Sequence, residues 1–430
     1  MRETRRDMVL ATSDMGNRPN KVKLAYLVSH PIQYQAPLLR RIAQEPDIDL
    51  TVFFGSDFSL GSYQDEGFGV SVKWDVPLLD GYHHRFLPVL RDNGTQTVTT
   101  PLNYGILSAL RGNRTDPKFD ILWVHGYAMV NAIHGMLAAK ALDIPVLLRG
   151  DMWLRDRPRS GPKLLLKQVF MRMLKNLVSG ILPVGTLNEE YWRHYFGEGV
   201  PLFLMPYAVD NDYFRRRSLD SATTKDELLL ELDLDKSKPV ILFASKLQKR
   251  KHCSDLLAAY RILIDKKSYA DRPYLVIVGD GEERSALEDL VRAEGLPDVR
   301  FCGFRNQSEL PRFFDIASVF VLPARHEPWG LIVNEIMNSG RAVIVSDDVG
   351  CHPDLITDGV EGYVYPVGNV DALANALQRV LDSPETAAKM GQNALRRIQT
   401  WSFEEDVLAL RAAIAQLTHK IPVTGTAIHS

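Results

Sequence analysis

The chain has 430 residues, of which 45% are apolar and 24% charged, and this composition is that of an ordinary globular protein with room for two domains of about 200 residues each. The formal net charge of −2 argues against nucleic acid as a partner, because nucleic-acid binding normally needs a strongly basic domain. The three cysteines are scattered without metal-ligand spacing, so we expect a reducing compartment, by default the cytoplasm, and no metal site.

Both ends of the chain lack the patterns of regular structure. Residues 1–20 begin with Arg2, Arg5 and Arg6, but the apolar stretch that follows these three is too short for a signal peptide, so we expect a disordered leader. Residues 418–430 show no periodicity and are expected to form a disordered tail. No window reaches the roughly 18 apolar residues of a transmembrane helix.

Strand-like apolar runs alternate with helical patterns along the chain, which predicts α/β architecture with parallel sheets in two Rossmann-like domains. The expected strands are 23–28, 50–54, 119–124, 145–148 and 180–184 in the first half, and 240–244, 274–278, 319–322 and 342–346 in the second. The expected helices include 34–44, 129–142, 164–177, 369–381 and 384–400.

A break in this alternation divides the chain. Segment 215–238 has no long apolar face, so we predict it to be a linker between an N-terminal domain at 21–214 and a C-terminal domain at 239–400, with a short helix in part of it as the alternative. Ser402 with Glu405 forms a capping-box pattern, which predicts a last helix at about 401–417.

The most informative stretch contains two glutamates, Glu327 and Glu335, separated by seven residues and preceded by the buried strand at 319–322. Apolar residues at helical spacing predict a helix that begins near Gly330, and the free amides of Gly330 and Leu331 would suit an anion such as phosphate. One carboxylate then flanks each side of that anion, which suits a nucleotide sugar with hydroxyls on both sides of its phosphates. The alternative is a loop carboxylate followed by a solvated helix residue.

A cluster of cations follows the strand at 240–244. Four of them fall within residues 246–251, and a basic surface turn explains Lys249 and Arg250. Lys246 directly follows the strand and Lys251 directly precedes a helix, so both are expected to face the crevice beside Glu327. There they would neutralise a departing pyrophosphate, on which negative charge grows in the transition state.

A Gly-x-Gly turn follows the strand at 274–278. Gly279 and Gly281 allow a ligand to approach the backbone closely. The third glycine of the dinucleotide fingerprint is replaced by Arg284, which argues against a dehydrogenase.

Several landmarks occur in a fixed order, at 206–210, 245–251, 278–281, 301–304, 327–335, 339–343 and 359–364. In this order they make residues 200–417 resemble the retaining glycosyltransferases of family 4, which have the two-domain GT-B fold. The resemblance implies two Rossmann-like domains with parallel sheets facing a cleft, and a C-terminal helix that crosses back to the N-terminal domain.

By this resemblance Glu327 would bind hydroxyls of a donor sugar, Glu335 the ribose of its nucleoside, and Lys246 with Lys251 its diphosphate. The donor-binding set further includes Gly281, Trp329, Gly330 and Leu331. The family usually has arginine where Lys246 stands, so the charge is kept but the bidentate contact is lost. Neither a cofactor nor a metal is expected.

The acceptor side is less well specified. The family often has a glycine-rich loop after the first strand, whereas this chain has His30 and Gln33 there. His125, which we count among the catalytic candidates, follows one strand, and Arg149 with Asp151 follows the next. Alternatively, His30 and Gln33 only cap a helix, His125 is structural, and Asp151 pairs with a neighbouring arginine.

A basic amphipathic pattern at 163–177 carries four cations among apolar residues. Such a helix could touch anionic lipid at the inner face of a membrane and deliver a lipid-linked acceptor. The alternative is a domain helix with a solvated basic edge.

These features together predict a retaining glycosyltransferase. It would move a sugar from a nucleotide diphosphate donor, preferably a UDP-sugar and alternatively a GDP-sugar, to a hydroxyl acceptor in glycan, polysaccharide or glycolipid synthesis. The rival functions are a GT-B nucleotide-sugar epimerase or phosphorylase, and a non-catalytic subunit that binds nucleotide sugars.

Overall fold

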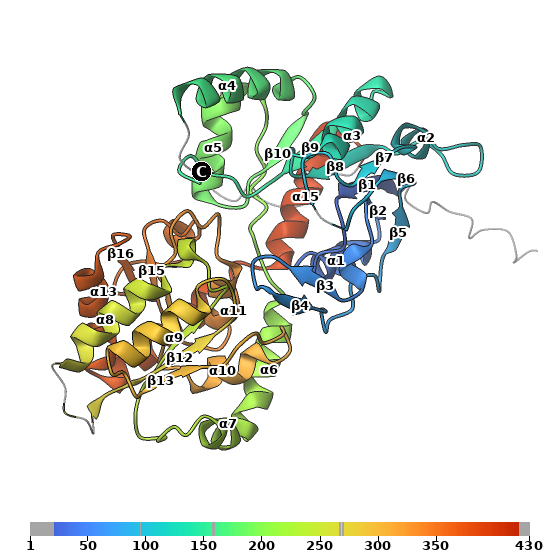
Figure 1. Ribbon diagram of the computed structural model, residues 1–430. Coiled ribbons are helices and arrows are strands. Elements are labelled where there is room, and N and C mark those ends of the chain that lie inside the picture. Colours follow the sequence, from blue (N-terminus) through green and yellow to red (C-terminus); the bar gives the residue numbers. More distant parts are fainter. Residues whose placement is uncertain (1–20, 95, 157–159, 266–267, 269–270, 421–430) are drawn as a thin grey trace, which may run out of the picture.

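The computed structural model describes residues 21–420 except 95, 157–159, 266–267 and 269–270. The expected leader at 1–20, and the tail from residue 421 onward, lie outside the described residues. Two α/β domains are visible in Figure 1, one drawn mainly in blue and green and the other in yellow and orange.

The N-terminal domain is built on a six-stranded sheet in the order β10-β9-β8-β1-β2-β5, in which all neighbours are parallel. Its strands are β1 (Val22–Val28), β2 (Ile48–Phe54), β5 (His83–Phe86), β8 (Ile121–His125), β9 (Val146–Arg149) and β10 (Gly180–Leu182). Its helices are α1 (Ala36–Ala43), α2 (Ile106–Arg111), α3 (Val130–Ala141), α4 (Gly161–Lys175) and α5 (Thr186–Phe196).

The C-terminal domain repeats this plan with a parallel sheet in the order β13-β12-β11-β14-β15-β16. Its strands are β11 (Val240–Ala244), β12 (Tyr274–Val278), β13 (Val299–Phe301), β14 (Val319–Leu322), β15 (Ala342–Ser346) and β16 (Gly362–Tyr365). Its helices include α8 (Cys253–Asp265), α9 (Arg284–Ala293), α10 (Leu310–Ile316), α11 (Leu331–Met337), α12 (His352–Leu355), α13 (Val370–Leu381) and α14 (Pro384–Ile398).

The continuous apolar strands explain why both sheets are parallel and covered on both faces. In β11 every residue is buried, and Leu242 belongs to the core on one face while Ile241 and Phe243 belong to the core on the other. The nine strands predicted from the sequence are all observed, which confirms the predicted fold class.

The segment predicted to be a linker is helical. Residues 215–238 fall within α6 (Asn211–Ser221), η3 (Ala222–Thr224), α7 (Lys225–Glu231) and the turn before β11. Leu228 and Leu229 are buried in the C-terminal core, where α6 and α7 pack on α10. Because the segment has no long apolar face, its sequence did not predict this packing. The chain crosses from one domain to the other just before α6 (Figure 1).

The last helix, α15 (Phe403–Thr418), crosses back to the N-terminal domain as predicted (Figure 1). Its predicted capping box of Ser402 and Glu405 is present. Leu410 and Ile414 lie in the core beside β1 and β2, and Arg411 forms ion pairs with Glu45 and Asp47.

A short hairpin of the N-terminal domain, β3 (Tyr63–Asp65) and β4 (Val70–Val72), leads into an extended segment that ends near Asp75. This stretch, 63–75, is called the arm below. It contacts the C-terminal domain through Phe68, whose ring lies 4.7 Å from that of Phe304, and through Asn306, whose side chain donates to the carbonyl of Lys73 at 2.6 Å.

Across the described residues, none of the helices combines the length and the apolar composition that crossing a membrane requires.

Candidate active site

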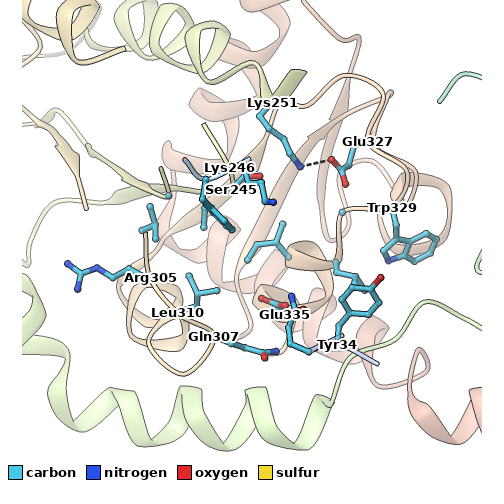
Figure 2. Close-up of a pocket in the computed structure, with 18 of the residues that line it drawn as sticks. Tyr34, Ser245, Lys246, Lys251, Arg305, Gln307, Leu310, Glu327, Trp329 and Glu335 are labelled. Carbon is cyan, nitrogen blue, oxygen red and sulfur yellow. Dashed lines mark hydrogen bonds and ion pairs between the residues drawn. The ribbon is translucent and has the colours of Figure 1, made fainter. Parts of the chain in front are cut away.

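A cavity of about 370 Å³ lies between the two domains. Most of its wall comes from residues that follow the carboxyl ends of β11, β12, β13 and β14, the edge at which parallel α/β sheets bind ligands. The N-terminal domain contributes the side chains Gln33, Tyr34, Phe68, Trp74 and Asp151. The site is thus formed jointly by both domains, and Figure 2 shows ten of its residues labelled.

Glu327 is held at this cavity by two cations. Its carboxylate accepts hydrogen bonds from Lys251 at 2.5 Å and from Arg250 at 2.8 Å, and it is only 9% exposed. Burial alone would raise the pKa of Glu327, but the charges of Lys251 and Arg250 outweigh burial and hold the pKa below its ordinary value. The side chain is therefore an ionised, oriented acceptor for hydroxyl groups.

The loop around Glu327 owes its shape to backbone bonds with the segment after β15. The amide of Glu327 donates to the carbonyl of Asp348 at 3.1 Å, and its carbonyl accepts from Gly350 at 2.9 Å. Gly330 has a φ of 91° and precedes α11, and both Gly330 and Leu331 line the cavity. The helix starts where the sequence predicted, although it is only seven residues long.

Lys246 has an unpredicted partner from the other domain. Its ammonium group binds both carboxylate oxygens of Asp65 in the arm, at 2.8 and 3.0 Å, and lies 4.7 Å from the ring centroid of Phe68. Lys246 still lines the cavity, so the arm places a negative charge where the sequence predicts an anionic ligand.

Glu335 lies away from the pair of Glu327 and Lys251, near Gln307 and Tyr34 in Figure 2. It is partly buried and has no hydrogen-bond or ion-pair partner among the described residues. Burial raises the pKa of Glu335 to about 8. Of the two glutamates in the cavity, Glu327 is therefore compensated by cations and Glu335 is not.

Of the two glycines that the sequence predicts beside the ligand, the Gly-x-Gly turn contributes only one to the cavity wall. Gly279 lines the cavity with a φ of 133°, and a Cβ atom there would lie 1.9 Å from the carbonyl oxygen of Ser245. Gly281 does not line the cavity. A Cβ at Gly281 would instead meet the carbonyl of Leu247 at 2.5 Å, so this glycine allows close packing of two backbone segments.

Trp329 borders the cavity, but most of its contacts are structural. It is 3% exposed, stacks on Trp401 at 5.7 Å between ring centroids, and donates from its indole nitrogen to Asn334 at 2.9 Å. A Cβ at Gly185 of the N-terminal domain would lie 2.4 Å from its ring. Trp329 therefore packs the two domains together beside the site.

The predicted acceptor-side residues divide into two groups. Gln33 and Asp151 line the cavity, and burial raises the pKa of Asp151. His30 and His125 are not part of the cavity wall: His30 stacks on Phe58, and Nδ1 of His125 is buried with no hydrogen-bond partner in the described part of the chain. Burial lowers the pKa of His30 to about 4 and that of His125 to about 3, so both rings are neutral at pH 7.

Arg149 requires a correction, because it points into the core instead of the cleft. Its guanidinium group donates to the carbonyls of Met205 and Pro206, at 3.2 and 2.7 Å, and to Asp406 of α15 at 3.4 Å. The residue is 3% exposed. Arg149 therefore anchors the last helix and the segment at Met205 and Pro206, just before the chain crosses between the domains, and it does not contribute to the acceptor side.

Tyr34, next to Gln33 in the loop expected near the cleft, also lines the cavity. Other wall residues were not singled out from the sequence. They are Phe68, Trp74, Tyr207, Phe304, Arg305, Gln307 and Leu310. Phe304 ends a motif that was recognised, and its immediate neighbours could have been included on that ground. Phe68 and Trp74 belong to the arm, for which the sequence carries no periodic signal.

In the part of the chain that the structure describes, no three His, Cys, Asp or Glu side chains are grouped so as to hold a metal ion.

Comparisons with known proteins show what the sequence and the fold resemble. Residues 224–397 match the family model for glycosyl transferases group 1. Among curated relatives, an alpha-D-kanosaminyltransferase of Streptomyces kanamyceticus is 31% identical over 179 residues, which cover 41% of this chain and 45% of that protein. A D-inositol 3-phosphate glycosyltransferase of Streptomyces avermitilis is 25% identical over 317 residues, covering 70% of this chain and 66% of that protein.

Solved structures extend the likeness to the whole fold. Sucrose-phosphate synthase from Thermosynechococcus elongatus superimposes with a TM-score of 0.67 at 18% identity, covering 93% of this chain and all of that one. HepE of Anabaena, in complex with UDP, gives a TM-score of 0.65 at 15% identity with the same coverage. The chain therefore has the two-domain GT-B fold of these structures, and residues 224–397 match the glycosyl transferases group 1 family.

Proposed function

We propose that this chain is a retaining glycosyltransferase that moves a sugar from a nucleotide diphosphate donor to a hydroxyl acceptor. The observation that carries the proposal is the cavity between the domains, because Glu327, Lys251, Lys246 and Glu335 all line it. It offers two cations for a diphosphate and a carboxylate on either side for hydroxyl groups, as a nucleotide sugar requires.

Each of these side chains has a role in the proposed reaction. Glu327 accepts hydrogen bonds from hydroxyls of the donor sugar, and Glu335 accepts them from the ribose. Lys251 uses one ammonium hydrogen on Glu327, which leaves two for phosphate oxygens. Lys246 contributes a second positive charge once its bond with Asp65 is exchanged for the donor. Contact of the phosphates with the amides of Gly330 and Leu331 remains a prediction.

The proposed chemistry is a displacement on one face of the sugar. The bond between the anomeric carbon and the diphosphate oxygen breaks, the acceptor oxygen bonds to the same carbon from the same face, and the acceptor proton passes to the diphosphate. Negative charge grows on the leaving group, where Lys246 and Lys251 stabilise it most in the transition state. These cations allow the step to proceed without a metal ion or a cofactor.

The preferred donor in this proposal is a UDP-sugar, with a GDP-sugar as the alternative. Solved structures of the similarly folded HepE contain UDP and UDP-glucose, which supports this preference. We propose a glycan or a lipid-linked sugar as the acceptor, and a cytoplasmic location, which the three free cysteines support.

A ligand panel tests the proposal. UDP, GDP, ADP and their sugars are compared by thermal shift, and the matching donor at a hundred times its Kd is expected to stabilise the protein by about 2.7 kcal/mol. Donor hydrolysis and transfer are then measured with the matching donor. Phosphate-dependent release of sugar would indicate a phosphorylase, isomerisation without an acceptor would indicate an epimerase, and binding without turnover a non-catalytic subunit.

The same ligand panel, applied to the Asp65→Asn variant, tests whether Asp65 competes with the donor for Lys246. Loss of the carboxylate charge is expected to strengthen donor binding roughly two- to fivefold, because this change in affinity corresponds to the free energy of a partly exposed ion pair. Weaker binding by this variant would show that Asp65 helps to hold the donor.

The affinity for the donor is expected to depend on pH through Glu335. Burial raises the pKa of Glu335 to about 8, so below pH 8 the empty site holds mainly the protonated acid. Because the ribose hydroxyls are best accepted by the carboxylate, binding must release that proton. Affinity should therefore rise with pH up to about 8 and fall up to about tenfold for each pH unit below it.

Titration calorimetry with the matching nucleotide sugar checks this prediction, since the diphosphate of a nucleotide sugar does not titrate in that range. In the Glu335→Gln variant the affinity should be lower and nearly independent of pH between 6 and 9. An equal pH slope in both proteins would assign the dependence to another group of the cavity.

A further inference from the structure

Helix α4 exposes an apolar surface that has no partner in the described structure. Only Met171 and Leu174 of this helix are buried in the core. The large apolar side chains that remain exposed, here called the α4 surface, are Leu164, Leu165, Leu166, Val169, Phe170 and Met173. Leu165, Leu166 and Met173 are 63%, 71% and 66% exposed, well beyond what packing on a neighbouring helix would leave.

The position of α4 leaves this surface open. The helix packs on α5, and Figure 1 shows it at the outer edge of the N-terminal domain. The chain segment that leads into α4 starts at the cavity. Asp151 lines the cavity, and the carbonyl of Arg155 accepts a hydrogen bond from His326, the neighbour of Glu327. The α4 surface is therefore joined to the rim of the site by one short stretch of chain.

The charges on α4 are all positive. The helix contains Lys163, Lys167, Arg172 and Lys175 and no acidic residue. Lys167 contacts the rings of Tyr191 and Tyr195, and Lys175 donates to the carbonyl of Phe196. Lys163 and Arg172 are exposed and have no ion-pair partner among the described residues.

We infer that the α4 surface docks on an anionic lipid bilayer, with its apolar side chains entering the headgroup boundary and Lys163 and Arg172 meeting the lipid phosphates. Charge complementarity favours this occupant over a second copy of the chain, because a symmetric contact would bring the same unpaired cations together. The inference goes beyond the proposed transfer reaction and does not depend on it.

Vesicle flotation tests the inference with the full chain. The protein is expected to float with vesicles of phosphatidylglycerol and phosphatidylcholine, and at least about tenfold less with phosphatidylcholine alone. A triple variant, Leu165→Ser, Leu166→Ser and Met173→Ser, should lose at least about tenfold in partitioning, because it removes the most exposed apolar groups. Reversing the charges with Lys163→Glu and Arg172→Glu should abolish the preference for anionic vesicles.

A matched control comes from the other domain. Leu219 in α6 and Leu230 in α7 are 69% and 83% exposed, so their double replacement by serine removes similar apolar area far from α4 and should leave flotation unchanged. The melting temperature and the donor-induced thermal shift of every variant show separately that the fold and the donor site are intact.

Three outcomes would overturn the inference. The wild-type protein could fail to float, or the triple variant could float as well as the wild type. The wild type could also sediment as a dimer that the triple variant dissociates without any flotation, which would assign the α4 surface to a second copy of the chain.

Discussion

Replacing Glu327 by glutamine is expected to lower the rate of sugar transfer by at least about a hundredfold. The carboxylate accepts from Lys251 at 2.5 Å and from Arg250 at 2.8 Å, so the substitution removes the charge that holds both cations in place. It also weakens the contact with the donor sugar in the transition state, at which the proposed mechanism directs this carboxylate. The loss should therefore appear mainly in kcat, measured with the donor identified by thermal shift.

Stability has to be separated from activity in this variant, because Lys251 is buried and would lose its counterion. The double variant Glu327→Gln with Lys251→Met removes the isolated charge and should recover stability, as followed by urea unfolding, without recovering turnover. Glu335→Gln provides the matched comparison: it should change the affinity for the donor more than kcat, since Glu335 is assigned to the ribose. Turnover of the Glu327 variant within about threefold of the wild type would refute its assigned role.

Part of the cavity wall that the C-terminal domain forms could be predicted from the sequence, because those residues follow strands that the sequence itself indicates. Buried strands such as β11 and β14 end in short loops, and parallel strands bring those loops to one edge of the sheet. Glu327 and Lys251 therefore meet although 76 residues separate them. Lys246 was also placed correctly at the cavity.

One contact that was missed lies within the C-terminal domain: Arg250, expected in a basic surface turn, binds Glu327 at the cavity. The other parts that were missed depend on contacts with the other domain or with the last helix. The arm has two short strands without a periodic apolar pattern, so nothing in the sequence predicts that Asp65 lies beside Lys246, 181 residues away.

Arg149 ends a strand, which by itself favours a residue that faces the cleft. Of its real partners, Asp406 is brought to it only by the return of α15, and the carbonyls of Met205 and Pro206 by the segment before α6.

Replacing Arg149 by alanine is expected to lower the free energy of unfolding by about 3–5 kcal/mol, because the change leaves a buried carboxyl group without its cation. Asp406 is fully buried, and the carbonyls of Met205 and Pro206 would lose a donor as well. Urea unfolding measures the loss. Arg193→Ala is the matched control, since Arg193 pairs with Glu189 on the surface and its removal should cost less than about 1 kcal/mol.

The effect of Arg149→Ala should also grow with pH. Burial raises the pKa of Asp406 to about 7, although Arg149 opposes this shift, so the folded state holds a proton that the unfolded state releases near pH 4. The buried Asp406 therefore lowers the free energy of unfolding as pH rises from about 4 to 7. Without Arg149 the pKa of Asp406 is higher still, so the free energy of unfolding continues to fall at higher pH. The difference between variant and wild type should then be larger at pH 8 than at pH 6. A difference that is independent of pH, or no larger than that of the Arg193 variant, would show that Arg149 does not compensate the charge of Asp406.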